Sequence, residues 1–351
     1  MSKEVELEIK DLAYGGQGVG RTEEGKVCFV ADVIPGEKVV VRMIREKRDF
    51  SEAELVEVQE ASQDRVVPPC EYFGRCGGCA YQHLAYPAQL LAKWNQVGVA
   101  LRRIGGFSDF EVQPVVPAPQ PYYYRNRITV HTREGITGFY DRSGRRVMDI
   151  RRCLIASEPV NQALAEYRGR RPFDGVRTLS SGESTGFRQT NDSVAILLLE
   201  EVAKQAGCGK LLIDAYCGSG FFAKRLRGQF EQVIGLEWNE RAVAAAKTDL
   251  LPNETYLQGD VSELLPSALA QVGDDASVLL VDPPAQGLAP QVVRSILEQP
   301  CKRIVSVSCN IATLARDLKK LAPLYELTTV IPLDMFPQTA EIEIVAVLEQ
   351  R

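Results

Sequence analysis

Nine cysteines and only two histidines limit the chemistry open to this sequence of 351 residues. Because His83 and His131 are the only histidines, a histidine-rich metal site is excluded and a histidine general base is disfavoured. Thiolates and carboxylates are the groups left for nucleophilic, proton-transfer or metal chemistry.

Cys309 is the cysteine best placed for nucleophilic attack. It ends an apolar segment, 303–308, and a helical pattern begins after Asn310. A helix amino terminus lowers the pKa of a nearby thiol and so raises its thiolate fraction, which a cysteine nucleophile requires. An inert cysteine at the end of a strand explains the residue by itself equally well.

Glu341 and Glu343 are the candidate proton acceptors, because they belong to the last pair of predicted strands and histidine is nearly absent. Those strands should bring carboxylates to the same end of the sheet as Cys309. Taken alone, the two glutamates fit an alternating exposed edge strand better.

A glycine turn indicates a nucleoside cofactor. Asp214 precedes Gly218 and Gly220 after one predicted strand, and Glu237 ends the next strand, where it could accept hydrogen bonds from ribose hydroxyls. Phe221 follows Gly220, so the G-x-G-x-x-G run that binds pyrophosphate is incomplete. S-adenosylmethionine therefore fits better than NAD, and a plain glycine turn in an α/β protein is the alternative.

Asp282 ends a further strand and is followed by Pro283 and Pro284, which places another carboxylate at the same edge of the sheet. An aromatic residue after Asp-Pro-Pro would suggest methylation of an adenine amino group. Ala285 stands there instead and argues against that reaction.

These candidates need a sheet to position them, and the pattern from about residue 195 onward supplies one. Helical and strand-like segments alternate, which predicts a mostly parallel sheet wrapped by helices. Segments 327–333 and 341–349 follow one another without a helix, so the final strand should run antiparallel at or near the sheet edge.

The first 190 residues have a different organisation. Residues 1–59 read as short strands of a small β-barrel, and 60–85 lose hydrophobic periodicity around three cysteines, so something other than a core must organise that stretch. A helix is predicted over 87–106. Its apolar positions at helical spacing are Leu91, Trp94, Val97, Leu101 and Ile104.

Arginine is concentrated in the middle of the chain. Residues 121–190 contain thirteen Arg, no Lys and seven Asp plus Glu, so they carry +6 although the whole chain carries −5. Arginine pairs well with phosphate, and the nearby aromatics Tyr122, Tyr123, Tyr124 and Phe187 could stack bases. A solvated charged surface is an equally good explanation of the composition alone.

Composition excludes other classes of protein. The length predicts two or three domains, and no apolar run approaches the roughly 20 residues that span a bilayer, so we expect no membrane association. The start, MSKEVELEIK, lacks signal-peptide features, so we expect a reducing cytoplasmic location and no disulfides.

Together these motifs resemble the RNA 5-methyluridine methyltransferases that combine an amino-terminal TRAM barrel, an iron-sulfur central domain and a Rossmann-like methyltransferase domain. The resemblance covers essentially the whole chain. It is carried by Cys70-x5-Cys76-Gly-Gly-Cys79-x-Tyr-Gln-His with Cys153, by Phe187-Arg-Gln189-Thr-Asn191, by Ser308-Cys309-Asn310-x-Ala-Thr-Leu-Ala-Arg-Asp, and by Met335-Phe-Pro-x-Thr-x-x-x-Glu343.

The resemblance implies an α/β fold with three domains: a TRAM/OB-like barrel at 1–59, an iron-sulfur and RNA-binding β-rich domain at 60–180, and the methyltransferase domain at 181–351. Helix 87–106 is expected to pack on the last of these. The substrate would be one uridine of structured RNA, foremost in 23S ribosomal RNA, with the transfer-RNA T-loop as alternative. A monomer is expected.

The resemblance also assigns roles to residues. Cys309 would be the nucleophile and Glu343 the general base. The residues implied at the S-adenosylmethionine site are Gln189, Tyr216, Gly218, Glu237, Asp260 and Asp282. Those implied as ligands of a 4Fe-4S cluster are Cys70, Cys76, Cys79 and Cys153. Four ligands close the cluster against radical chemistry, although their spacing alone suits zinc equally.

Three positions depart from the family pattern. Phe221 stands where an Asn is usual, Ala285 where an Arg is usual, and Ile311 where a Pro is common. The first two motivate an alternative function, a catalytically silent iron-sulfur RNA-binding or assembly protein. Cytosine C5 methylation is disfavoured, because no cysteine accompanies Pro284.

Overall fold

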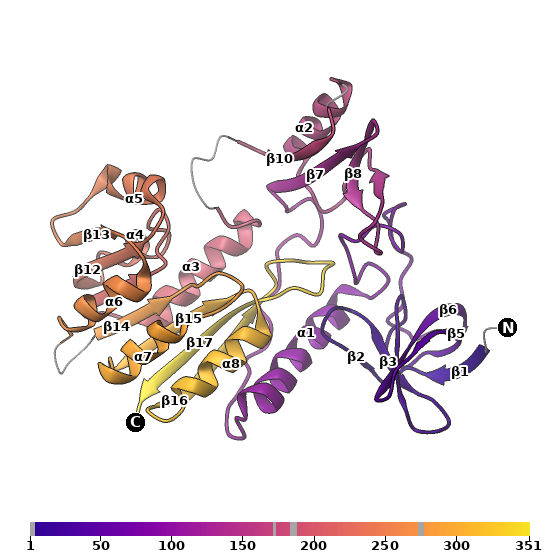
Figure 1. The fold of residues 1–351 in the computed structure, drawn as a ribbon, viewed down its shortest axis with the longest axis horizontal. Helices are drawn as coiled ribbons and strands as arrows, with labels where there is room; N and C mark the ends of the chain where they lie inside the picture. The colour runs from indigo at the N-terminus through magenta and orange to yellow at the C-terminus, as the bar shows by residue number, and fades with distance from the viewer. Residues whose placement is uncertain (1–3, 171–172, 183–187, 273–276) are drawn as a thin grey trace. The chain divides into compact units, whose positions relative to one another are not determined.

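The computed structural model describes residues 4–170, 173–182, 188–272 and 277–351 (Figure 1). The chain divides into two compact units, each assembled from separate segments. Unit 1 comprises Met1–Gln96, Gln120–Ser181 and Phe336–Glu341, and unit 2 comprises Val97–Pro119, Gly182–Met335 and Ile342–Arg351.

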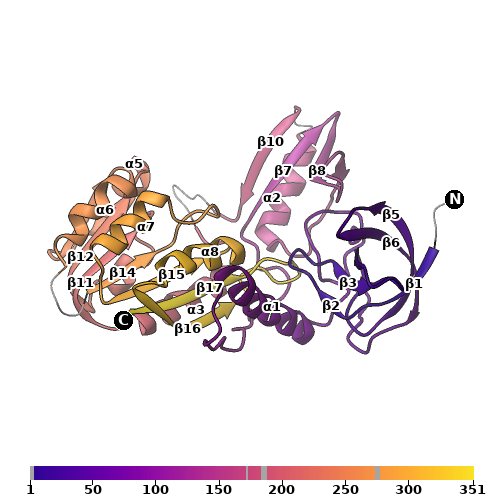
Figure 2. The same ribbon diagram turned by 60° about the horizontal axis from the view of Figure 1, so that its bottom comes forward.

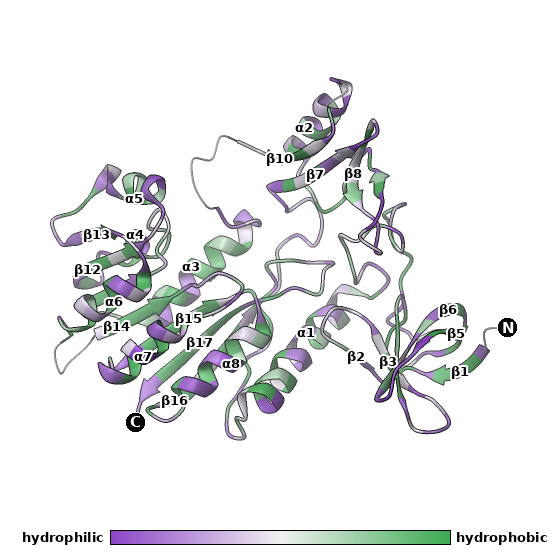
Figure 3. Ribbon diagram, viewed as in Figure 1, coloured by the Kyte–Doolittle hydropathy of each residue, from purple (hydrophilic) through white to green (hydrophobic). Residues whose placement is uncertain are grey.

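Unit 2 contains a seven-stranded sheet in the order β13-β12-β11-β14-β15-β17-β16. Its central strands are buried on both faces and therefore consist of nearly continuous apolar runs, which Figure 3 shows along β14 and β15. The strands are β11 (Gly209–Ala215), β12 (Phe230–Glu237), β13 (Glu254–Gln258), β14 (Ser277–Val281), β15 (Arg303–Ser308), β16 (Tyr325–Leu333) and β17 (Glu343–Gln350).

Helices cover both faces of this sheet. Helices α6, α7 and α8 pack in sequence on one face, and α3 and α4 pack on the other (Figures 1 and 2). The helices are α3 (Asp192–Ala206), α4 (Ala223–Leu226), α5 (Glu240–Ala246), η2 (Lys247–Asp249), α6 (Val261–Leu269), α7 (Pro290–Glu298) and α8 (Ile311–Leu321). The predicted alternation of helix and strand is therefore confirmed.

The last two strands form an antiparallel hairpin that completes the sheet. β17 runs antiparallel to both β15 and β16, so the prediction of its direction is confirmed. β16 occupies the edge, and β17 lies one strand inside it. Six consecutive buried residues from Glu343 to Leu348 reflect that inner position.

The amino-terminal part of unit 1 is a six-stranded sheet in the order β1-β5-β6-β4-β3-β2. It closes on a small apolar core that includes Leu7, Val30, Val39 and Val41. The strands are β1 (Glu4–Glu8), β2 (Asp11–Leu12), β3 (Gly18–Arg21), β4 (Val27–Val30), β5 (Lys38–Glu46) and β6 (Phe50–Glu60).

The middle of the chain forms a second sheet in unit 1, in the order β10-β7-β8-β9, with helix α2 packed on one face. Ile128 and Val130 alternate inward along β7 and contact Val160 and Leu164 of the helix. The elements are β7 (Arg127–Arg133), β8 (Ile136–Tyr140), β9 (Val147–Asp149), α2 (Glu158–Gly169) and β10 (Gly175–Ser180).

The cysteine-rich stretch that follows β6 consists of turns, as its loss of periodicity predicted. The expectation that it has no core is wrong in part. Tyr81 and Leu84 are buried with Leu12 and Ile34 in a small apolar cluster of their own. The end of the stretch is therefore fixed by packing, while the cysteines precede that cluster.

The predicted helix is confirmed as α1 (Tyr86–Ala100), continued by the π-helix η1 (Leu101–Gly105). Its predicted apolar face is wrong in part, because Leu91, Trp94 and Ile104 are exposed. The buried positions include polar Gln89, Lys93 and Gln96. Their side chains donate hydrogen bonds to backbone carbonyls, a use that apolar spacing does not reveal.

Candidate active site

The glycine turn after β11 is held in left-handed backbone conformations. Tyr216, Gly218 and Gly220 have φ of +68°, +55° and +85°. A Cβ at Gly220 would lie 2.9 Å from the Tyr256 hydroxyl, so only glycine fits there, whereas a Cβ at Gly218 would meet no described atom within 4 Å. The turn thus presents open backbone at the carboxyl end of the strand.

Glu237 is brought to this turn from the end of β12. It is buried, and its Oε2 accepts a hydrogen bond from the Gly218 amide at 3.1 Å. Its Oε1 accepts one from the Asn239 amide at 2.8 Å. The sequence assigned the glycine turn and this carboxylate to one nucleoside site, and the structure places the two in direct contact.

Two carboxyl groups lie on the adjacent central strands. Asp214, on β11, is fully buried, and burial raises its pKa to about 8, with Asp282 and Glu237 adding to the rise. Its Oδ2 accepts a bond from the Ala223 amide at 2.9 Å, but Oδ1 has no partner among the residues that the structure describes. Asp282 follows β14, and removal from water raises its pKa too.

Asp260 and Gln189 are positioned by helix termini. Asp260 is the N-cap of α6, and its Oδ1 accepts bonds from the Ser262 amide at 2.7 Å and hydroxyl at 2.6 Å, which lower its pKa. Gln189 is buried two residues before Asn191, the N-cap of α3. The Asn191 amide group also donates to the Met335 carbonyl at 3.5 Å. Phe187 lies outside the described residues.

The strand register brings Cys309 and Glu343 to the same level of the sheet. β15 and β17 pair antiparallel, and their last pair is Ser308 with Ile344. One residue beyond that last pair, the same register brings Cys309 level with Glu343, although the ladder itself ends at Ser308. Cys309 follows the last residue of β15, and Glu343 is the first residue of β17. The two groups with the strongest motif support therefore lie at the same end of neighbouring strands.

The surroundings of these two residues differ. Cys309 is partly exposed, whereas Glu343 is buried with 3% of its surface accessible. Glu341, the other candidate base, is exposed. Cys309 itself precedes the Asn310 N-cap, whose Oδ1 accepts bonds from the Ala312 and Thr313 amides. The thiol thus lies just outside the helix, at its positive end.

Sequence reasoning missed Asp317, which fixes the loop after Asp282. Its buried Oδ2 accepts a bond from the Leu288 amide at 2.7 Å, and Arg316 and Lys320 pair with it. Thr313 donates to the carbonyl of Ala285 at 3.1 Å. Nothing in the loop sequence signals this, because the partners come from α8. The loop holds its shape through these bonds, with Ala285 in place of the family's Arg.

Phe221, the other departure, packs against a neighbouring aromatic ring. Its ring lies 4.8 Å from that of Phe222, which is buried. The position therefore adds an apolar surface beside the glycine turn.

The four cysteines of the proposed cluster are gathered in unit 1. Burial, together with the smaller effect of the charges of Cys153, Cys76 and Cys70, raises the pKa of Cys79 to about 12. The Gly78 amide donates to the Cys76 sulfur at 3.4 Å. In the described parts of the chain, no group of three or more His, Cys, Asp or Glu side chains has a geometry that could hold a metal ion.

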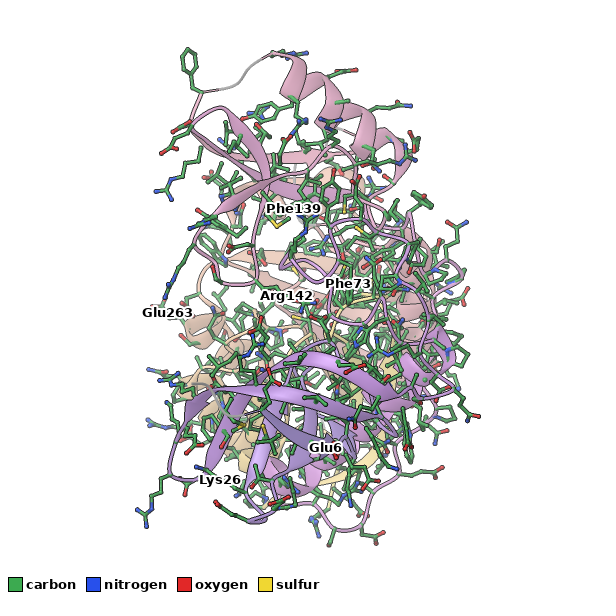
Figure 4. All side chains as sticks on the ribbon, turned by 90° about the vertical axis from the view of Figure 1, so that its right-hand side faces the viewer. Glu6, Lys26, Phe73, Phe139, Arg142 and Glu263 are labelled. Carbon is green, nitrogen blue, oxygen red and sulfur yellow. The ribbon has the colours of Figure 1, made fainter. Side chains whose placement is uncertain are left out.

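Arg142 links this cysteine segment to its neighbours. Its guanidinium lies 5.3 Å from the Phe73 ring centre, and Figure 4 labels the two side chains in the same region. It also pairs with Asp32 through two hydrogen bonds, one of them 2.7 Å long. Cys76 forms an isolated bridge with Asp141, beside Arg142. Residues from several parts of unit 1 therefore meet around Arg142, next to Cys76.

Some arginines of the middle segment are paired. Arg152 pairs with Glu158, Arg168 with Asp149, and Arg188 with Asp192, which lies just outside the segment. No helix in the described part of the chain is long and apolar enough to cross a membrane.

Comparison with known proteins identifies the family. A TRAM domain model matches residues 2–56, and a tRNA (uracil-5-)-methyltransferase model matches 273–351. The chain is 30% identical to RNA methyltransferases of Synechocystis sp. and Gloeobacter violaceus, over 98% and 99% of this chain and 95% and 96% of theirs.

A solved structure matches the fold over the same length. The crystal structure of Pyrococcus abyssi tRNA (uracil-54, C5)-methyltransferase in complex with S-adenosyl-L-homocysteine has a TM-score of 0.72 and 23% identity. The match covers 98% of this chain and 100% of that one, which confirms the predicted fold of the TRAM and methyltransferase parts. The chain therefore belongs to the TRAM-containing family of RNA (uracil-5-)-methyltransferases.

Proposed function

We propose that this enzyme methylates C5 of one uridine in structured RNA, with Cys309 as nucleophile and Glu343 as general base. The observation that carries the proposal is the pairing of β15 with β17, whose last pair, Ser308 with Ile344, lies directly before Cys309 and directly after Glu343. The open glycine turn and the carboxylates of Glu237 and Asp282 lie at the same edge of the same sheet.

Each residue has a defined task in this reaction. C5 of uracil is a poor nucleophile, so the Cys309 thiolate adds to C6 and converts the ring to an enolate. C5 of the enolate then forms a bond to the methyl group, whose bond to the sulfonium sulfur of the methyl donor breaks and leaves a neutral thioether. Glu343 removes the C5 proton, and the electron pair expels the Cys309 sulfur from C6, which regenerates the thiolate and releases 5-methyluridine.

S-adenosylmethionine supplies an electrophilic methyl group when bound. The residues present fit it, because the buried Asp214 Oδ1 lacks a partner in the described structure and the turn at Gly218 is open. Glu237 would accept hydrogen bonds from the ribose hydroxyls. Gln189, Tyr216, Asp260 and Asp282 would line the rest of the site. The target base should leave its stack to reach them.

The test of this mechanism is single-turnover methyl transfer from labelled cofactor to RNA. Cys309→Ala should abolish transfer and form no covalent adduct. Glu343→Gln should still transfer the methyl group and then remain joined to the RNA, because proton removal fails. Unchanged turnover by either variant would contradict the role of that residue. Absence of methyl transfer in Glu343→Gln, with cofactor binding retained, is also inconsistent, since this variant should still methylate C5 before it stalls.

For the RNA, we propose a uridine of 23S ribosomal RNA, with a transfer-RNA T-loop uridine as second candidate. The matching family model and the Pyrococcus enzyme, both named for transfer RNA, support the second. Nucleoside analysis of both RNA classes from a strain lacking the protein separates them. Family membership and the placement of Cys309 and Glu343 at the same end of neighbouring strands disfavour the catalytically silent alternative.

We also propose that Cys70, Cys76, Cys79 and Cys153 hold a closed 4Fe-4S cluster with a structural role. What supports the proposal is that burial raises the pKa of the Cys76, Cys79 and Cys153 thiols and that the charge of Cys70 adds to the rise in each, so thiolates without a cation would be costly there. The side chains must rotate to reach a common metal. Iron content is the test, and zinc in its place would contradict the proposal.

A further inference from the structure

The loop of residues 336–341 belongs to unit 1, although the strands on either side of it, β16 and β17, belong to unit 2. Only Ile342 separates this loop from Glu343, the proposed base. The loop therefore leads directly into β17, the strand whose first residue is Glu343.

Other segments of unit 1 donate hydrogen bonds to the backbone carbonyls of the first three loop residues, 336, 337 and 338. Tyr124 donates its hydroxyl to the Pro337 carbonyl at 2.9 Å, and Lys93 donates its ammonium to the Phe336 carbonyl at 3.0 Å. The amides of Ala80 and Tyr81 both donate to the Gln338 carbonyl, at 2.9 and 3.0 Å. These two residues directly follow Cys79.

Gln338 and Gln89 form the centre of the attachment. Gln89, on α1, donates to Gln338 Oε1 at 3.0 Å and accepts from the Gln338 amide at 3.2 Å. Both side chains are buried, with 1% and 2% of their surface accessible. Gln338 has a φ of +69°, a conformation that a non-glycine residue keeps only when its surroundings impose it.

We propose that Gln89 and Gln338 are positioning residues for the general base. Together with the segment after Cys79 they fix the loop from which Glu343 enters its strand. The inference rests on the proposed role of Glu343. It links the residues directly after Cys79 to catalysis, because the amides of Ala80 and Tyr81 are hydrogen-bonded to the loop that leads to the base.

The physical reason is the geometric demand of proton abstraction. A base must lie within hydrogen-bond reach of the proton that it removes, and a misplacement of about 1 Å can cost on the order of 100-fold in rate. Cofactor binding and the addition of Cys309 do not use Glu343. A displaced loop should therefore slow only the last step of the reaction.

The experiment compares two identical substitutions on one helix. Gln89→Met removes the bonds to the loop, and Gln96→Met is the matched control. Gln96 is also buried on α1, but it donates to Leu12, Ala13 and Tyr81 instead of the loop. Gln338→Gly removes the same side-chain pair from the other side and keeps the left-handed backbone.

The readout is the fraction of enzyme joined covalently to methylated RNA after denaturation, measured on iron-loaded protein. In Gln89→Met and Gln338→Gly this fraction should rise severalfold while turnover falls about tenfold or more and cofactor affinity stays within twofold. Gln96→Met should show no rise. Gln338→Asn, which keeps a short amide and tolerates positive φ, should recover part of the turnover.

A fall in turnover without accumulation of the adduct would overturn the inference, because it would mean a general structural defect. An equal rise in Gln96→Met would do the same. Glu343→Gln measured alongside separates the two proposals. If it accumulates no adduct, the assignment of the base fails; if it alone accumulates adduct, only the positioning role fails.

Discussion

Asp214 is an acid kept in its neutral form by the core of the sheet. It is fully buried beside Asp282 and Glu237, and its pKa of about 8 lies far above the ordinary value of 3.8. Between these two values the folded protein retains a proton that the unfolded chain has lost. The stabilising contribution is therefore present at low pH and is lost as the pH rises through about 8.

This difference predicts the effect of Asp214→Asn on stability. The free energy of unfolding of the unsubstituted protein should fall relative to the variant by up to roughly 1.4 kcal/mol per unit between pH 5 and 8. Urea denaturation at each pH measures it. Asp260→Asn is the control, because Asp260 is exposed with a lowered pKa and is ionised throughout. Parallel curves for the protein and Asp214→Asn would contradict the assignment.

Individual site residues could be predicted from the sequence where a short motif contains them. Cys309, Glu343 and the Gly218 turn lie in motifs that can be read from a few neighbouring residues. Gln89, Gln338 and Asp317 could not be predicted, because their partners lie in other segments. A glutamine on an amphipathic helix carries no sign that it bonds a residue 249 positions away.

Among the elements, the loop between β14 and α7 depends most on a single glycine. Gly287 has a φ of +80°, and a Cβ there would lie 2.2 Å from Asp317 Oδ2 and 2.6 Å from Arg316 Nη2. Both atoms belong to the group that holds the loop. Any side chain at Gly287 must therefore displace that group as well as strain the backbone.

Gly287→Ala should destabilise unit 2 by roughly 2–4 kcal/mol and weaken cofactor binding, because the displaced loop begins at Asp282. Gly144→Ala is a matched control: its φ is +69°, and its Cβ would meet no described atom within 4 Å. It should cost only the backbone term of about 1–2 kcal/mol. Denaturant unfolding compares the two, and equal losses would show that the contact with Asp317 is unimportant.

Most helices and strands could be predicted from the sequence, but which face of a helix is buried was harder to predict. Alternation of apolar runs and helical patterns sufficed for β11, β12, β14 and β15, because buried parallel strands tolerate little else, whereas β13 and α6 were not recognised as separate elements. The buried face of α1 was predicted wrongly at Leu91 and Trp94, since polar side chains that bond backbone carbonyls can occupy a buried face.

For the whole molecule, the residues proposed for the cofactor all lie in unit 2, and the four cysteines all lie in unit 1. The purified protein should contain about four irons per chain and absorb visible light under anaerobic handling. Removal of the iron should lower the unfolding temperature of unit 1, because the stretch before Tyr81 has little apolar packing.

After removal of the iron, the affinity for S-adenosylmethionine should change by less than twofold, which calorimetry on the same preparation can measure. Glu237→Gln tests the opposite case. This variant should bind S-adenosylmethionine more weakly and keep the iron content of the unsubstituted protein. Stoichiometric zinc without visible absorbance would contradict the cluster assignment. A large loss of cofactor affinity on removal of iron would contradict the separation of the two functions.

The division into two units that exchange segments was not predictable from the sequence. Composition and motifs suggested consecutive domains, whereas unit 1 recruits residues 336–341 from near the end of the chain. Such an exchange depends on contacts between distant residues, and no local pattern records those contacts.

That late segment has a consequence for synthesis on the ribosome. Domains usually fold as they emerge, amino-terminal part first. Here Gln89 and Tyr124 emerge early, yet their partners in residues 336–341 are translated more than 200 positions later. The amino-terminal unit must wait, partly assembled, until almost the entire polypeptide has been made. Any chain that stops before residue 336 leaves these buried polar groups without their partners, so a truncated product should be an early target for proteolysis.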